Sequence, residues 1–187
     1  MVFIHDTRSA LLATVDLVNT HPSTSSEGED TLTTVADLDD FLRVHPYTGG
    51  IRHDAEELAE MRDIRERLRA LWNVDREGAV PLVNAMLHDG GAVPRLVIHD
   101  DYDWHVHATS DDAPLATRIL VEAAMAFVDV IRSDEYGRVR LCDADDCESV
   151  YIDMSRNGSK RYCDTGNCGN RMNVIAYRKR QAERESA

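Results

Sequence analysis

The sequence contains no long hydrophobic run and no recognisable export signal. None of its 187 residues lies in an apolar stretch of the roughly 20 positions that a membrane-spanning helix requires. Residues 1–20 lack the basic start and the small-residue cleavage site of a secretory signal peptide. We therefore expect a soluble, cytoplasmic protein that has no membrane partner.

The sequence also lacks the short motifs that announce common catalytic sites. It has no glycine-rich phosphate loop, no nucleophile elbow and no catalytic-triad signature. It contains no internal repeat or low-complexity tract. Paired acidic residues are frequent, but in a chain this acidic they do not indicate a site. We therefore expect a protein that is not an enzyme.

Positive charge is scarce over the first three quarters of the chain. The protein has 34 acidic and 21 basic residues, which gives a formal net charge of −13. Residues 141–187 hold eight of each sign, so the whole acidic excess lies in residues 1–140. Residues 154–181 hold seven Lys or Arg residues, and Asp164 is their only acidic companion. Because the acidic excess lies in residues 1–140 and the basic cluster in residues 154–181, the negative net charge does not exclude binding to nucleic acid.

Cysteine is absent from the first 141 residues and then occurs four times. Cys142 and Cys147, and then Cys163 and Cys168, form two Cys-x4-Cys pairs that are separated by fifteen residues. Four thiolates on two such turns suit a tetrahedral, structural Zn²⁺ site. Two disulfides, an iron–sulfur cluster or four unrelated buried thiols are the alternatives, and disulfides are disfavoured because cytosolic thiols stay reduced. We predict one zinc ion per chain.

The motifs around these cysteines resemble a known family. Residues 168–171 read CGNR, and residues 153–157 (DMSRN) and 160–163 (KRYC) precede them. This pattern is similar to the CGNR zinc finger of bacterial transcription regulators, where the finger follows an ABATE domain marked by an early Asp-x-x-Asn-Thr. Residues 16–20 have that form. Lys160 replaces an expected arginine and Tyr162 a common tryptophan, and neither is a proposed ligand. The resemblance implies a treble-clef-like finger with four cysteine ligands and a role in DNA-dependent regulation.

Hydrophobic periodicity predicts an α+β protein with a mainly helical first domain (residues 1–137) and a zinc finger (138–187). Thr34 is expected to begin a helix with a capping box, and Trp104, Val106 and Ala108 are expected to face the core. The polar break at residues 133–137 marks the domain boundary, and we expect two folding units. The expected helices are 9–20, 34–45, 53–72, 81–88, 115–131 and 168–183, with a hairpin of strands 95–99 and 104–108 and finger strands 138–141 and 149–153.

Two further clusters could bind ligands. His105 and His107 share one strand face and could hold a second metal with Asp100 or Asp101, although such a face is more often half-solvated. Asp16 and Asn19 lie three apart on one helix face and could line a ligand pocket. The alternative for Asn19 and Thr20 is that they satisfy backbone groups at the end of that helix.

The basic residues of the finger fall into two groups. Arg171 is close enough to Cys168 to offset the negative charge of a zinc–thiolate centre, and Asn170 could shape the turn. Arg178, Lys179 and Arg180 lie more than ~15 Å along the helix from Cys168, which suits contacts with phosphate. A solvated helix end, where cations complement the macrodipole, is the alternative. The remaining candidates for DNA contact are Arg156, Lys160 and Arg161 on the preceding loop, and Asn173, which could read a base.

These observations lead to three functional hypotheses. The first is a DNA-binding regulator whose acidic domain senses a small-molecule or protein signal or pairs subunits into a homodimer. The second is a zinc-stapled protein-interaction module that does not bind DNA. The third, which has the least support, is an enzyme or a small-molecule sensor with a site near Asp16, Asn19 and the hairpin. Because phosphate contacts weaken steeply with salt, the salt dependence of binding separates the first two.

Overall fold

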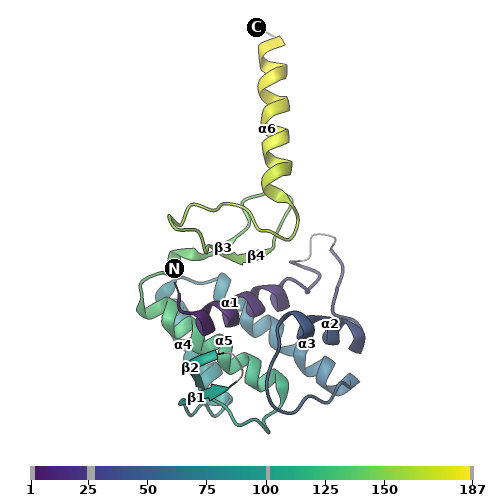
Figure 1. Cartoon of the computed structure of the whole chain (residues 1–187). Coiled ribbons are helices and arrows are strands. Elements are labelled where there is room, and N and C mark those ends of the chain that lie inside the picture. Colours follow the sequence, from purple (N-terminus) through teal and green to yellow (C-terminus); the bar gives the residue numbers. More distant parts are fainter. Residues whose placement is uncertain (1–2, 25–27, 100–101, 186–187) are drawn as a thin grey trace.

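The computed structural model describes residues 3–24, 28–99 and 102–185 and shows a helical body, a small finger and one projecting helix (Figure 1). The mixed α+β class is confirmed. Among the described helices, none is both long and apolar enough to cross a lipid bilayer. The helices are α1 (His5–Val18), α2 (Val35–Val44), α3 (Ala55–Arg69), α4 (Arg76–Asp89), α5 (Leu115–Arg132) and α6 (Cys168–Glu185), with short 3₁₀ turns η1 (Ala70–Trp72) and η2 (Tyr136–Arg138). The strands are β1 (Arg95–His99), β2 (Tyr102–His107), β3 (Val139–Leu141) and β4 (Val150–Ile152).

Helix α5 is the centre of the body. Most of its residues are buried, and α1, α3 and α4 pack around it. Phe127 is fully buried and meets the edge of Trp72 with ring centroids 5.5 Å apart. A helix that is apolar on most faces needs such a cover of other helices, which is the arrangement that its sequence predicts.

Side-chain caps set where the helices of the body begin. Thr34 and Asp37 form the predicted capping box at α2. Helix α4 begins at Arg76, because Asp75 accepts a hydrogen bond from the Gly78 amide at 2.8 Å. The predicted start at Pro81 was wrong by more than one turn. The Asp75 cap was the overlooked signal, since an aspartate there satisfies an amide that the first turn leaves free.

The hairpin β1–β2 is confirmed, but its orientation is opposite to the prediction. Trp104 and Val106 are exposed, and only Ala108 of the three expected core residues is buried. His105 and His107 lie on the half-buried face instead, with their Nε2 atoms 3.1 Å apart. Asp100 and Asp101 lie outside the described residues. Within those residues, the four cysteines are the one group of three or more side chains suited to a metal.

The antiparallel pair β3–β4 joins the finger to the body. Val150 and Ile152 belong to the main core, whereas Tyr151 between them faces the cysteine cluster. The Tyr151 carbonyl accepts a hydrogen bond from Trp72 Nε1 at 3.1 Å. Alternate side chains of one short strand therefore serve both parts of the protein. The boundary between residues 137 and 138 stays a prediction.

A buried ion pair should stabilise the body. Arg65 is buried and binds both carboxylate oxygens of Asp30 at 2.8 Å. The hydrogen bond from Arg65 lowers the pKa of Asp30 to about 2. Since the folded pKa is depressed, this stabilisation is present above the ordinary carboxyl pKa and is lost as pH falls through about 2.

We expect Asp30→Ala to lower the free energy of unfolding at neutral pH by about 3 kcal/mol, because Arg65 would be left buried without its anion. Urea denaturation measures this change, and the difference between wild type and variant should shrink as pH falls below about 4. Asp40→Ala, which breaks an exposed pair with Arg43, is the control and should change stability by less than about 1 kcal/mol. Equal effects of the two substitutions would contradict the prediction.

Candidate metal centre and nucleic-acid interface

Four sulfur atoms converge where the finger meets α6. Cys142 follows β3, Cys147 and Cys163 lie in loops, and Cys168 begins α6. All four Sγ atoms lie within 4.8 Å of one another, and Cys163 Sγ is 3.7 Å from those of Cys147 and Cys168. A tetrahedron with Zn–S bonds of about 2.3 Å places its sulfurs about 3.8 Å apart. The cage therefore fits one zinc ion and is too small for a cluster of several irons.

The thiols are free and are held in a buried, hydrogen-bonded setting. None of the four forms a disulfide, and Cys142, Cys163 and Cys168 are buried. Burial raises the pKa of the Cys142 and Cys168 thiols above the ordinary value, so zinc binding must displace protons. The Cys163 amide donates to Cys142 Sγ at 3.4 Å. Arg171 Nη2 donates to Cys168 Sγ at 3.3 Å and to Asp146 at 2.7 Å, which places positive charge beside the thiolates.

The loop between β4 and Cys163 is held by hydrogen bonds of Asp153 and Arg138, to which the sequence analysis assigned no structural role. Asp153 is fully buried and accepts hydrogen bonds from the amide and hydroxyl of Ser155 and from the Lys160 amide. Burial acts to raise the pKa of Asp153, but these hydrogen bonds hold it below its usual value. Arg138 donates to the carbonyls of Asp153 and Ser155. The DMSRN run signalled this role, because an aspartate two residues before a serine commonly caps a turn.

Residues 13–134 match the sequence model of the ABATE family, described as "Putative stress-induced transcription regulator", and residues 138–181 match the CGNR zinc finger. The chain belongs to the ABATE family. The resemblance proposed from the sequence is thereby confirmed, and so is a structural zinc site formed by the four cysteines. A comparison with curated proteins finds no match.

The Asp-x-x-Asn-Thr motif of the ABATE domain meets the zinc finger directly. Asn19 is buried; its Oδ1 accepts from the Val150 amide and its Nδ2 donates to the Val150 carbonyl, both at 2.9 Å. The Asn19 side chain thus makes the pair of backbone hydrogen bonds that a neighbouring strand would make with β4. Asp16 is exposed and pairs with His45 at 2.7 Å, so the two polar residues of the motif have different surroundings. Thr20 donates to the Leu17 carbonyl, which satisfies a backbone group at the end of α1.

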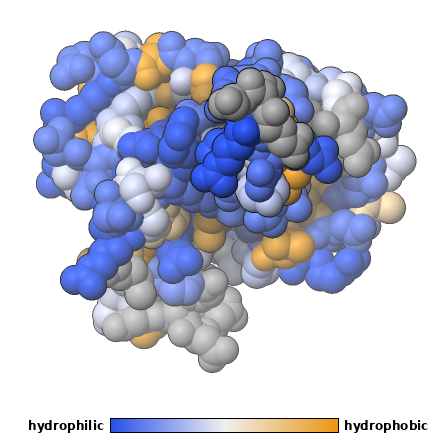
Figure 2. Space-filling view, turned by 90° about the horizontal axis from the view of Figure 1, so that it is seen from above, coloured by the Kyte–Doolittle hydropathy of each residue, from blue (hydrophilic) through white to orange (hydrophobic). Residues whose placement is uncertain are grey.

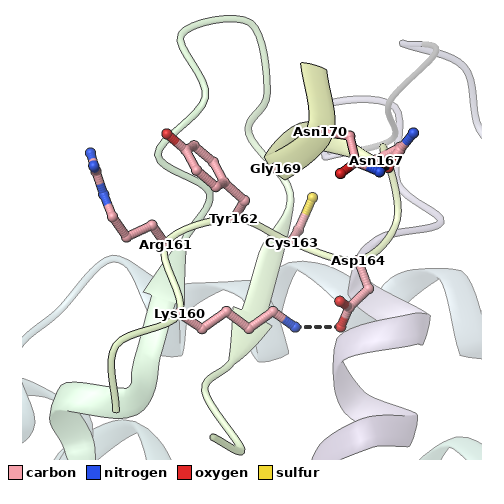
Figure 3. Close-up of a pocket in the computed structure, with 8 residues that line it drawn as sticks. All are labelled: Lys160, Arg161, Tyr162, Cys163, Asp164, Asn167, Gly169 and Asn170. Carbon is pink, nitrogen blue, oxygen red and sulfur yellow. Dashed lines mark hydrogen bonds and ion pairs between the residues drawn. The ribbon is translucent and has the colours of Figure 1, made fainter. Parts of the chain in front are cut away.

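A cavity of about 320 Å³ lies beside the start of α6, lined in part by Lys160, Arg161, Tyr162 and Asn170 (Figure 3). Lys160 Nζ lies 2.5 Å from the Asp164 carboxylate, and Arg161 is 2.9 Å from Asp143. Asn170 Nδ2 donates to Asn167 Oδ1 at 2.8 Å. The charges of both basic residues are therefore partly matched by acids of the finger itself.

The rest of α6 projects from the finger (Figure 1). Its residues are exposed from Asn173 to Arg184 except for the half-buried Gln181. Within residues 3–24, 28–99 and 102–185, no ion pair involves Arg178, Lys179 or Arg180, and Arg156 on the loop is likewise exposed and unpaired. The basic residues on the outer part of the helix are therefore available to an external anion.

Proposed function

We propose that this zinc-binding regulator binds duplex DNA through α6 and that its ABATE domain senses a small-molecule or protein signal. The observation that carries the proposal is the projecting, exposed part of α6 (Figure 1). From Asn173 to Arg184 it extends about 18 Å beyond the finger. The major groove is about 12 Å wide and admits one helix. A helix of this length is only marginally stable alone in water, so a bound partner would stabilise it.

One face of α6 has the composition expected for reading bases. Asn170, Asn173, Tyr177, Arg180 and Arg184 follow one another at steps of three or four residues and therefore lie within an arc of about 80°. An asparagine amide matches adenine and an arginine guanidinium matches guanine. Since Asn170 is already bonded to Asn167, Asn173 is the stronger candidate for a base contact.

The neighbouring cations are distributed unequally around the helix. Arg180 lies on the Asn–Tyr–Arg face, whereas Arg178 and Lys179 lie about 120° and about 140° from its centre, one on each side. Arg180 is therefore the best placed of the three for a phosphate contact beside a groove, and Arg178 lies slightly nearer to the face than Lys179 does. On the loop, Arg156 and Arg161 are exposed near the base of the helix and could add phosphate contacts.

The acidic body lies away from the helix that would enter DNA (Figure 1). Viewed along α6 from its outer end, the surface is mainly hydrophilic, with small separate hydrophobic areas (Figure 2). That surface suits a polar partner better than a large apolar one. The hydrogen bonds between Asn19 and Val150 connect the ABATE domain directly to the finger. We assign no catalytic step to either part.

A protein partner is the second candidate. Val174 and Ile175 on α6 are about half exposed, which favours docking of a protein more than contact with phosphate. A site near Asp16 and Asn19 has less support, because both polar atoms of Asn19 are already bonded.

Fluorescence anisotropy of the zinc-loaded chain with a mixed-sequence duplex at about 50 and 200 mM salt tests the proposal. We expect binding that weakens steeply with salt. Arg178→Ala combined with Arg180→Ala should weaken binding to all sequences and reduce the salt slope by about two units, because two phosphate contacts are lost. Alanine preserves the helix, so the change reports contact rather than folding.

Lys179→Ala is the matched control for Arg180→Ala, because it removes the same charge from the same helix about 140° from the centre of the Asn–Tyr–Arg face. It should change the affinity much less than Arg180→Ala does. Equal losses would contradict the assigned face. Absence of binding by wild-type protein at low salt would remove the DNA proposal and leave the protein-docking module.

A further inference from the structure

The β1–β2 hairpin presents an apolar face to solvent. Leu96 and Val106 are opposite one another in the register, and Ile98 and Trp104 continue the same face toward the turn. Their exposed fractions are 67%, 37%, 56% and 64%. A sheet with one solvated face normally carries polar side chains there. These four residues, the hairpin patch, therefore have a composition that fits an interface.

We propose that two copies of the chain associate through the hairpin patch in a two-fold dimer. The apolar face of one hairpin matches a second copy of itself. Two sheet faces pack about 10 Å apart with interdigitating side chains. In a two-fold contact the same patch serves both subunits, so uncharged residues meet uncharged residues.

The size of the patch agrees with such a contact. A large side chain exposes on the order of 150–250 Å² when nothing covers it. Multiplying this area by the four exposed fractions gives a patch of roughly 400 Å². A standard interface buries about 800 Å² per partner, of which somewhat more than half is apolar. The hairpin patch supplies that apolar share.

The hairpin itself would gain from this contact. A two-stranded hairpin is marginal on its own in water. A second hairpin laid over the patch would add a second layer on the side where these side chains are exposed.

The position of the patch makes this inference independent of DNA binding. The hairpin lies at the end of the body away from α6, so a dimer formed there leaves both α6 helices free (Figure 1). Because the net charge of −13 resides in the bodies, two approaching copies repel one another. Added salt screens this repulsion and should strengthen the dimer, whereas it weakens phosphate contacts.

Sedimentation velocity of the zinc-loaded full chain across micromolar concentrations tests the dimer. We expect a concentration-dependent dimer that becomes more populated as salt rises. Leu96→Lys and Trp104→Lys should each raise the dissociation constant more than about tenfold, since each places a charge in the contact. Both positions are exposed, so the fold should survive. Val44→Lys, at an apolar position on α2 that is 69% exposed, is the control and should leave the dimer unchanged.

Acrylamide quenching of tryptophan fluorescence gives an independent signal. Trp72 is buried, so quenching reports mainly Trp104. Quenching should fall as wild-type concentration rises and should not change for Leu96→Lys. A monomer at every concentration, or a dimer that survives both lysine substitutions, would overturn the inference. Leu96→Lys should still bind a short duplex as wild type does, so failure of the dimer and failure of DNA binding are distinguishable.

Discussion

Cys163→Ser is expected to abolish stoichiometric zinc binding and to disorder the zinc-binding loops and the attachment of α6. Cys163 is buried, and its sulfur lies 3.7 Å from two of the other three. Zinc contributes about 10–16 kcal/mol to the folding of isolated finger peptides. No other interaction of the four-cysteine site would replace that free energy if zinc binding were lost. Once detached, α6 should lose much of its helicity, because a single short helix is marginal in water. Elemental analysis and far-ultraviolet circular dichroism measure the two effects.

The same substitution should leave β4 in place. Val150 and Ile152 pack in the main core, and Asn19 holds the Val150 amide. Hydrogen exchange should therefore show loss of protection in residues 142–149 and 155–171, while the Val150 amide stays protected. Arg171→Ala removes a charge beside Cys168 without removing a ligand, and it should weaken zinc binding only about tenfold. Full zinc occupancy in Cys163→Ser would falsify the four-cysteine site.

Asn19→Ala is expected to lower the free energy of unfolding by about 3 kcal/mol, because it leaves the amide and the carbonyl of Val150 buried without partners. Zinc stoichiometry should not change, since no cysteine is touched. The Val150 amide should lose protection from exchange, which is the reverse of the pattern expected for Cys163→Ser. Chemical denaturation and hydrogen exchange provide both measurements.

Asp16→Ala is the control within the same motif. Asp16 is exposed and pairs with His45 at the surface, so its removal should change stability by less than about 1 kcal/mol. If Asp16→Ala lowered the free energy of unfolding as much as Asn19→Ala does, the contribution of the motif to stability would depend on Asp16 as well. Wild-type stability and exchange for Asn19→Ala would show that the Asn19–Val150 bonds do not hold the finger to the body.

The metal centre could be predicted from the sequence because its information is local. Four cysteines in two matched pairs define a ligand set wherever the loops lie, and CGNR and Asp-x-x-Asn-Thr identified the family. Most helix positions were predictable for a similar reason, since periodicity and caps such as Thr34 act over a few residues, but α1 begins at His5 and not at the predicted residue 9. The α4 start was missed because the Asp75 cap lies well before Pro81, where the predicted helix began.

The tertiary structure decided which surface each element buries. Alternation in the hairpin defines two faces but not which one meets the body, so Trp104 and Val106 were assigned to the wrong side. Likewise, Asn19 and Val150 are 131 positions apart, and no local pattern indicates that the motif of one domain completes a strand of the other. The projection of α6 also follows from the cage, because the four sulfurs fix where the helix starts. Residue type and spacing thus determined the chemistry, whereas burial and long-range hydrogen bonds, which depend on the whole chain, determined its placement.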